Sequence, residues 1–490
     1  MAYIPVGLDV GSKNTRLALL NGQQPSVDSR PRIVSNADGH RSTLSLCKIL
    51  EDGQVLVGEA CKKWCDREKI STKSVSIRQL CLSEGNEKAV AEFFSNFRQL
   101  ACDANNVDSS SEESVLFPVI SAPVSSTSES EFIKNLQYGI KDGLCSLTTG
   151  RSNNGKGKGL NTAFALLSDP AAVCVAHGLT GEGSDSSYAN LRKRIIVVDW
   201  GSSSLKVSEI SIVSGFIEIL QTVEDTSCSG DAITQILMQH CTSMFERKNR
   251  ICGLMDSKKA VAKLRTVCED AIRTLSRGAS TVTIMSDGLF EGIDLNISLS
   301  RPRFEMLCGK LFRNAGQVMS NVCKERGADS YDAILSAGNI CSMPQASSLV
   351  TSIFPSAWKG DKNISPEEAI AMGCSIHANS LLNNRMQTCK NPDYSCESEV
   401  QVSPVSLGVK ANDSVIIFIQ IGMPLPAKTN HDIGSCTELV IVQIDQNSEI
   451  EIAKLKIPDS LSGQNFRLGL SLSTEGKIKV AVNDGREYEV

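Results

Sequence analysis

The chain has 490 residues, of which 41% are hydrophobic and 21% are charged, and its formal net charge is −5. This length suggests two to four domains, and the acidic balance argues against a nucleic-acid-binding body, which would be strongly basic. The N-terminal residues lack a basic stretch followed by a long apolar one, and no apolar run approaches the length of about 18 residues that a membrane helix needs. We therefore expect neither a signal peptide nor a membrane span.

The 18 cysteines form no Cys-x-x-Cys motif and no regular framework. Several of them, such as Cys174 and Cys268, lie in apolar runs, where a free thiol behaves as a small hydrophobic group. No set of cysteine and histidine pairs has the spacing of a zinc site. A reducing cytosol is therefore the expected compartment.

The first part of the chain alternates predicted strands and helices. Short strands joined by polar turns occupy residues 1 to about 60, and an amphipathic helix is predicted over 88–101. The acidic, serine-rich stretch 103–114 predicts a solvated loop. A strand over 115–121 and a helix over about 128–143 follow it.

Residues 148–162 form an insertion rich in Gly, Asn and Lys that contains a near-match to a phosphate-binding P-loop. A P-loop has Ser or Thr after its lysine and lies between a buried strand and a helix. In this chain Gly157 follows the lysine and both flanks are polar. A surface loop is the favoured interpretation.

From about residue 194 the strand-rich pattern begins again. Two long helices are predicted over about 229–246 and 257–277, and strands over about 281–299. A further helix is predicted to begin after Ser300, because a serine N-cap with a proline just inside the start is typical of helix N-termini.

The last part of the chain changes character. A strand over 333–336 and a helix from about Pro366 complete the α/β pattern, and the polar segment 384–401 is the candidate linker. After it, alternating β runs separated by turn residues indicate a compact antiparallel β module. These runs lie at 415–420, 437–444, 449–456, 466–472 and 477–482.

A strand–turn–strand phrase occurs twice, at residues 6–19 and 195–207. In each copy an apolar run ends in an aspartate, Asp9 or Asp199, and a turn of Gly and small polar residues leads into a second β run. Such a turn exposes backbone N–H groups that can hold phosphate, and an aspartate at the end of a buried strand can hold a hydrated Mg²⁺. Two facing copies predict a two-lobed phosphotransfer clamp with Asp9 and Asp199 as metal ligands through water.

Signature segments along essentially the whole chain resemble those of the 70-kDa heat-shock protein family, and they occur in the family's order. They begin with the first phosphate turn and end at the start of the β module. The matching segments are 9–13, 36–45, 168–179, 199–201, 265–276, 289–294, 338–344, 365–373 and 402–409.

This resemblance implies an α/β actin-like nucleotide-binding domain of two lobes, followed by a small all-β sandwich domain without a helical lid. The implied boundaries are 1–383 for the nucleotide domain, with lobe I at about 1–190 plus 365–383 and lobe II at about 194–364, then the linker 384–401 and the β domain 402–490.

The resemblance also implies an ATP site between the lobes, and it leaves the need for Mg²⁺ open. The positions that match the family's nucleotide-binding residues are Asp9, Gly11, Ser12, Lys13, Asn14, Asp199, Gly201, Ser202, Ser203, Ser204, Gly230, Asp231, Glu269, Arg273, Ser276, Gly338, Asn339, Ser342 and Glu367.

Three departures from the family fall on positions that serve hydrolysis. Arg78 replaces the lysine that positions the attacking water, and an arginine keeps the charge but not the compact ammonium geometry. Asp169 replaces a longer glutamate before a proline. Lys206 replaces the carboxylate that ends the second phosphate loop, so attraction for a nearby divalent cation becomes repulsion. The chain is therefore expected to be at most a weak ATPase.

Further departures concern the adenosine pocket and the linker. Ile272 replaces a lysine of the pocket, and Ser342 stands where the family has the arginine that stacks on adenine. The segment 384–401 lacks the leucine-rich stretch that couples nucleotide state to the β domain. These losses affect hydrolysis, coupling and client trapping, while the residues that carry the fold remain.

The pattern resembles the short, atypical family members of the Ssz type, which pair with a zuotin-type J-domain protein in the ribosome-associated complex. The resemblance implies a cytosolic chaperone cofactor that binds ATP with little or no hydrolysis and stimulates another 70-kDa chaperone acting on nascent chains. Direct RNA binding would require a basic surface. Contact with the ribosome is therefore expected through the partner.

Two alternatives stay open. A conventional ATP-hydrolysing chaperone that binds unfolded clients would need an efficient active site and a coupling linker. A small-molecule kinase of the same actin-like superfamily would need an aspartate that activates the acceptor, and no such residue can be singled out; the C-terminal β module and residues 290–294 also argue against a kinase.

Overall fold

The structure is a computed structural model. The chain forms two compact units, unit 1 over Met1–Ser395 and unit 2 over Cys396–Val490. This division falls inside the segment expected as a linker. The described residues are 2–20, 30–68, 75–81, 86–105, 114–122, 144, 164–179, 192–213, 216–324, 326–388, 406–412, 414–419, 427–436, 438–445, 448–457, 464–472, 478–482 and 486–489.

A six-stranded sheet forms the first lobe of unit 1, with the strand order β3-β2-β1-β7-β8 and with β4 paired to β2. β1 (Ala2–Val10) and β2 (Asn14–Leu19) form an antiparallel hairpin, and β7 (Ser114–Ala122) runs parallel to β1. The remaining strands of the lobe are β3 (Arg32–Ile33), β4 (Thr43–Leu44), β8 (Ala165–Ser168) and the separate hairpin of β5 (Cys47–Ile49) and β6 (Val55–Val57).

One face of β1 packs against α3 (Glu87–Ala104). Leu8 shares a buried cluster with Phe93, Phe94 and Phe97 of that helix, and the edge-to-face contact of Phe93 with Phe94 has ring centroids 5.5 Å apart. This packing confirms the predicted amphipathic helix over 88–101. The lobe also contains α1 (Glu59–Glu68) and α2 (Ile77–Cys81).

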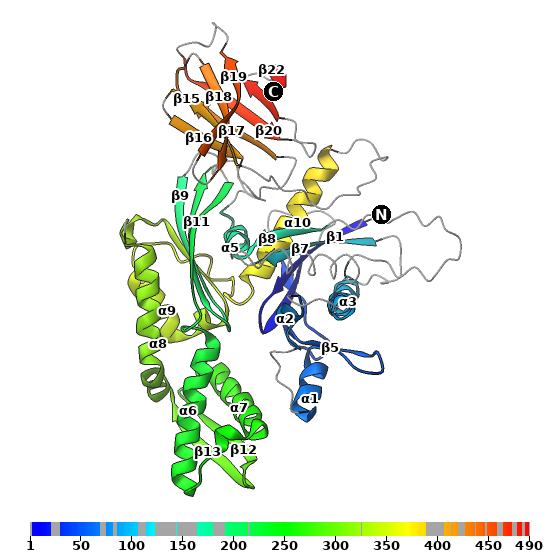
Figure 1. The fold of residues 1–490 in the computed structure, drawn as a ribbon, viewed down its shortest axis with the longest axis vertical. Helices are drawn as coiled ribbons and strands as arrows, with labels where there is room; N and C mark the ends of the chain where they lie inside the picture. Colours follow the sequence, from blue (N-terminus) through cyan, green and yellow to red (C-terminus); the bar gives the residue numbers. More distant parts are fainter. Residues whose placement is uncertain are drawn as a thin grey trace, which may run out of the picture. The chain divides into compact units, whose positions relative to one another are not determined.

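The opposite face of β1 packs against α10 (Ala369–Thr388), which Figure 1 shows in yellow beside β7 and β8. The contact is backbone to backbone, because a β-carbon on Gly7 would overlap the carbonyl oxygen of Ala371. Gly373 brings α10 equally close to α5 (Asp169–Ala176), where a β-carbon would overlap the carbonyl oxygen of Ala172. α10 thereby packs closely against α5 and against β1, the strand that leads into the first phosphate turn.

The second lobe of unit 1 repeats this arrangement with the strand order β11-β10-β9-β14. β9 (Arg192–Trp200) and β10 (Leu205–Val213) form the antiparallel hairpin, and β14 (Ala333–Ala337) runs parallel to β9 as β7 does to β1. β11 (Phe216–Asp225) lies at the edge. The doubled phrase of the sequence is therefore doubled in the sheet topology.

Helices and one hairpin complete the second lobe. Ser229, Ser257 and Ser300 each accept a backbone hydrogen bond as N-caps, which confirms the predicted helix start at Ser300. The elements are α6 (Gly230–Asn249), η4 (Leu254–Asp256), α7 (Lys258–Ser276), β12 (Thr281–Phe290), β13 (Ile293–Ser300), α8 (Arg301–Val322), η5 (Ala328–Ser330), η6 (Asn339–Ser342) and α9 (Pro344–Ile353).

Unit 2 consists of two four-stranded antiparallel sheets, with the orders β16-β15-β18-β19 and β17-β20-β21-β22. Residues from both sheets, such as Val409 and Leu468, share one buried cluster, as in a sandwich. The strands are β15 (Ser406–Ala411), β16 (Ser414–Ile419), β17 (Ala427–Ile433), β18 (Glu438–Asp445), β19 (Ser448–Lys456), β20 (Phe466–Leu472), β21 (Ile478–Val482) and β22 (Arg486–Glu489).

The structure differs from the sequence-based prediction at α10. The helix begins at Ala369 rather than near Pro366, and it continues to Thr388, so residues 384–388 of the expected linker are helical. A polar stretch without Gly or Pro can continue a helix. The predicted helix 128–143, the insertion 148–162 and residues 389–401 lie outside the described residues. Among the described helices, none is both long and apolar enough to cross a membrane.

Candidate functional site

Two equivalent turns form the floor of the candidate site. In the first, the N–H of Gly11 donates to the carbonyl oxygen of Asn14 at 3.1 Å, and in the second Gly201 donates to Ser204 at 3.0 Å. The two turns meet directly, since the hydroxyls of Ser12 and Ser202 are 2.8 Å apart. Two facing glycine- and serine-rich turns are suited to hold phosphate oxygens.

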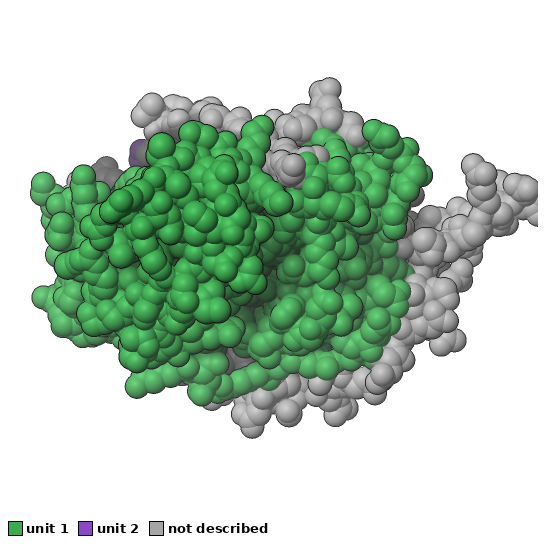
Figure 2. All heavy atoms as spheres, turned by 90° about the horizontal axis from the view of Figure 1, so that it is seen from below, with its two compact units in different colours: residues 1–395 green, residues 396–490 purple. Residues whose placement is uncertain are grey.

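A cleft of about 740 Å³ lies above these turns, and Figure 2 shows the face of unit 1 hollowed at its centre. The cleft is lined by every residue that the sequence assigned to nucleotide binding, together with Asp169 and Lys206. The side chain of Arg78 lies outside the described residues, although its backbone belongs to α2. The structure therefore brings segments that are far apart in the sequence, from both lobes of unit 1, to one place.

The strand-end aspartates of the two lobes have the same kind of neighbour. Asp9 lies opposite Arg16 in the β1–β2 register, and their side chains approach to 4.0 Å. Asp199 lies opposite Lys206 in the β9–β10 register. Directly opposed residues of an antiparallel pair point to the same face of the sheet. Each aspartate therefore has a basic side chain at the same spacing, and the sequence interpretation missed Arg16.

Lys206 also contacts the first lobe. Its Nζ lies 3.7 Å from Oδ2 of Asp169, and the two side chains are 12% and 5% exposed. The other carboxylate oxygen of Asp169, Oδ1, is buried and has no hydrogen-bond partner among the described residues. Asp169, which replaces a glutamate, and Lys206, which replaces a carboxylate, thus form one largely buried ion pair with each other.

The segment that leads into α10 supplies two further ion pairs. Glu367 accepts from Arg16 at 2.9 Å, and Glu368 pairs with Arg41 at 2.7 Å. Glu367 was predicted to bind nucleotide, and in the structure it lines the cleft but holds Arg16. The segments 36–45 and 365–373 were already recognised as signature segments, but their contact was not predicted.

The α7 side of the cleft carries the residues expected at the ribose and the base. Glu269 pairs with Lys13 at 2.7 Å and with Arg265 at 3.7 Å. Arg273 pairs with Asp270 at 2.9 Å, and both side chains are more than half exposed. The hydroxyl of Ser276 donates to the carbonyl oxygen one turn back, at Ile272, at 2.8 Å.

The base side of the cleft depends on a glycine. Gly338 has φ +84°, and a β-carbon there would overlap the carbonyl oxygen of Trp200, so only glycine fits between β14 and η6. Asn339 and Ser342 follow it and line the cleft together with the apolar side chains of Ile272 and Ile340. The two isoleucines form an apolar patch beside polar groups, which is suited to an aromatic base.

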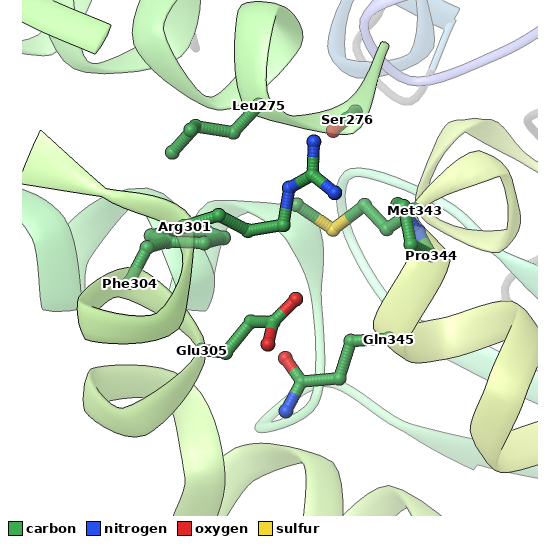
Figure 3. A pocket seen from close by; sticks show the side chains of 8 residues that line it. All are labelled: Leu275, Ser276, Arg301, Phe304, Glu305, Met343, Pro344 and Gln345. Carbon is green, nitrogen blue, oxygen red and sulfur yellow. The ribbon is translucent and has the colours of Figure 1, made fainter. Parts of the chain in front are cut away.

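A second, much smaller pocket shares Ser276 with the cleft as a lining residue (Figure 3). Its volume is about 10 Å³, which is room for about one water molecule. Oε1 of Gln345 is buried without a partner among the described residues, and Figure 3 shows it facing the carboxylate of Glu305. Turning the amide by half a rotation would let its nitrogen donate to that carboxylate. The pocket is too small for a nucleotide group.

Buried thiols lie behind the carboxylates of both lobes. Burial raises the pKa of Cys374 well above its usual value, and the charges of Asp9 and Asp169 raise it further. Burial, followed by the charge of Asp199, raises the pKa of Cys341 to about 12. Both thiols are neutral at pH 7 and do not compete as charged ligands. Within the described residues, no group of three or more His, Cys, Asp or Glu is arranged to hold a metal ion.

The comparisons with known proteins agree with this geometry. The family model described as "Hsp70 protein" matches residues 151–431, which is more than half of the chain. The chain belongs to the Hsp70 family. The fold of unit 1 is consequently the nucleotide-binding domain of Hsp70, with mixed α/β sheets consistent with the actin-like ATPase fold, and family membership implies a nucleotide site.

Similar curated proteins carry Hsp70 names. The chain is 26% identical over 430 residues to "Heat shock cognate 70 kDa protein 3" of Dictyostelium discoideum, covering 84% of this chain and 65% of that protein. It is 25% identical over 494 residues to "Heat shock 70 kDa protein" of Trichophyton rubrum, covering 97% and 72%. The chain therefore spans about two thirds of the length of these relatives.

Proposed function

We propose that this Hsp70-family chain is a chaperone cofactor that holds a nucleotide between its two lobes with little or no hydrolysis. The observation that carries this proposal is the placement of one basic side chain beside each strand-end aspartate, Arg16 at Asp9 and Lys206 at Asp199. In this proposal the cations of the chain itself take over charge compensation that a divalent metal would otherwise supply.

The residues fit a nucleoside triphosphate. The two glycine–serine turns meet at Ser12 and Ser202, and such turns bind phosphate through backbone N–H groups. Lys13 and Lys206 line the same cleft, and a lysine ammonium is an effective point-charge partner for phosphate. Binding in the cleft would stabilise the folded unit by mass action even without turnover.

The residues fit Mg²⁺ less well. Asp9 and Asp199 could hold a hydrated ion, but Lys206 is directly opposite Asp199. A single positive charge about 5 Å from a divalent ion costs about 7 kcal/mol at an effective dielectric constant of about 20. Asp169, which the sequence assigned to hydrolysis, already has Lys206 as its partner. These contacts support binding without efficient hydrolysis.

The nucleotide proposal is tested by calorimetric titration of ATP with excess Mg²⁺ and with EDTA, together with a steady-state ATPase measurement. We expect similar affinity under both conditions and no steady turnover. Lys206→Asp, which restores a carboxylate, should make binding depend on Mg²⁺. Lys454→Asp, at an exposed ion pair of unit 2, is the matched control and should change nothing. Metal-dependent binding with steady turnover in the unaltered chain would instead support a conventional ATP-driven chaperone.

The proposed partner is a J-domain protein of the zuotin type, with which this chain would form a heterodimer and stimulate another 70-kDa chaperone on nascent chains. The net charge of −5 favours indirect attachment to the ribosome. Affinity purification of the chain from cytosol should bring down a J-domain protein and ribosomes. Sedimentation of the isolated chain with ribosomes would contradict indirect attachment.

A further inference from the structure

Four side chains of alternating charge form a row that begins at Lys13 in the cleft. Nζ of Lys13 lies 2.7 Å from Oε2 of Glu269, and Oε1 of the same carboxylate lies 3.7 Å from Arg265. Arg265 in turn lies 3.3 Å from Asp231. Asp231 is in the first turn of α6, where a negative charge interacts favourably with the helix dipole.

The first member of this row belongs to a different lobe from the other three. Lys13 is in the β1–β2 turn of the first lobe, whereas Glu269 and Arg265 are on α7 of the second. The side chains of Lys13 and Glu269 are 35% and 15% exposed, so solvent screens their interaction only in part. The neighbouring hydrogen bond between Ser12 and Ser202 joins the same two lobes. The Lys13–Glu269 pair, called the cross-cleft pair below, is therefore a direct connection between the lobes.

A phosphate group in the cleft would compete with Glu269 for Lys13. Both are anions, and both would lie within reach of the same ammonium group, because Lys13 is part of the turn that faces the phosphate site. Glu269 can release Lys13 without being left uncompensated, since Arg265 remains beside it. An unpaired, largely buried carboxylate would otherwise be costly.

We infer that the cross-cleft pair holds the lobes together in the nucleotide-free protein, and that nucleotide binding exchanges it. Lys13 leaves Glu269 for a phosphate oxygen, and Glu269 keeps Arg265 as its partner. This step rests on the proposed nucleotide site. Its consequence is that closure of the cleft does not require a ligand, and that each binding event opens one lobe-to-lobe contact as it forms others.

The test is a charge swap, measured by hydrogen exchange of the backbone amides of residues 10–15 and 258–276 without nucleotide. Lys13→Glu and Glu269→Lys should each speed exchange about fivefold, the effect of losing an ion pair of about 1 kcal/mol. The double variant should restore part of the lost protection, because it regains an opposite-charge pair between the lobes while its lysine at position 269 repels Arg265. Lys13→Met and Glu269→Gln, which add no repulsion, serve as milder versions if a charge reversal prevents folding.

Nucleotide titration of the same variants separates this inference from the proposed function. The double variant should close without ligand yet bind ATP weakly, because the carboxylate introduced at position 13 would face the phosphates. Lys454→Glu, at an exposed pair in unit 2, should affect neither measurement. Unchanged exchange in both single variants, or no restoration in the double variant, would overturn the inference. If the unaltered chain did not bind ATP, the nucleotide proposal would be refuted. The hydrogen-exchange result, which is measured without nucleotide, would still show whether the cross-cleft pair holds the lobes together.

Discussion

The two lobes of unit 1 share one strand–turn–strand phrase, but they use its basic residue differently. In the first lobe, Arg16 lies between Asp9 and Glu367, and Glu367 belongs to the segment that returns to the same lobe. In the second lobe, Lys206 lies opposite Asp199 and reaches Asp169, at the start of α5 in the first lobe. The basic residue of the phrase thus makes ion pairs within the first lobe in one case, and an ion pair between the two lobes in the other.

The lobes also differ at the centre of the phrase strand. The first lobe has Gly7 two positions before its aspartate, and the second has Val197 at the same position. Gly7 lets α10 contact the strand backbone, whereas Val197 is buried as an ordinary core side chain. The first lobe therefore depends on close backbone packing where the second depends on side-chain burial.

The largest expected effect comes from removing this difference. Gly7→Val should destabilise unit 1 by about 5 kcal/mol, because the backbone of α10 cannot move away as a flexible side chain could. Val197→Ala should cost about 2 kcal/mol through the cavity it leaves. Urea unfolding measures both. Gly309→Ala, inside α8 with only the end of Arg313 nearby, is the control and should be neutral or slightly stabilising. Equal losses for Gly7→Val and Val197→Ala would contradict this account.

A second effect concerns His177, which follows α5 and connects the two lobes. Its Nδ1 accepts a hydrogen bond from the N–H of Asp361 at 3.0 Å, and burial lowers its pKa to about 4. The unfolded chain, with a histidine pKa near 6.5, therefore binds more protons between these values. The contribution of neutral, buried His177 to the free energy of unfolding is complete above about pH 6.5. About 3 kcal/mol of that free energy is lost as the pH falls to about 4.

The free energy of unfolding as a function of pH checks this. His177→Gln can still accept from Asp361 but does not titrate, so the variant should lose less stability than the unaltered chain over the same range. Parallel pH profiles for the two proteins would show that His177 is not the titrating group.

Much of this architecture could be predicted from the sequence. The doubled phrase predicted two equivalent sheets, and the serine N-cap at Ser300 predicted the start of α8. Local signals of this kind are read from spacing and turn residues alone. The polar strands β17 and β22 were missed, because a stretch such as residues 428–432 shows no apolar alternation.

The pairing within the site was harder to predict. Lys206 was recognised as a departure, but its partner Asp169 is far away in the sequence, and their contact depends on how α5 is placed by α10. Arg16 was overlooked because it carries no signature of its own; only the strand register places it opposite Asp9. Sequence patterns therefore located the residues of the cleft, while the tertiary packing determined which charges meet.

A third prediction concerns the ion pair between Lys206 of the second lobe and Asp169 of the first. Asp169→Asn removes the negative partner of the partly buried Lys206 and should lower the free energy of unfolding by about 2 kcal/mol. Asp270→Asn removes an exposed partner, that of Arg273, and should cost less than about 0.5 kcal/mol. Both changes replace a carboxylate by an amide of the same size, so the difference isolates burial. If both variants lost the same free energy of unfolding, the buried pair of Lys206 with Asp169 would contribute no more to stability than an exposed pair.

The smallest expected effect on stability is at Arg273 itself. Its side chain is 54% exposed and pairs with Asp270 within α7, so Arg273→Ala should change the free energy of unfolding by less than about 0.5 kcal/mol. The same variant should weaken ATP binding, because the guanidinium lies on the base side of the cleft and can stack on an aromatic ring. Lys13→Met should weaken ATP binding too, but it should also weaken the connection between the lobes. Thermal unfolding and ATP titration of both variants separate a residue that only contacts ligand from one that also joins the lobes.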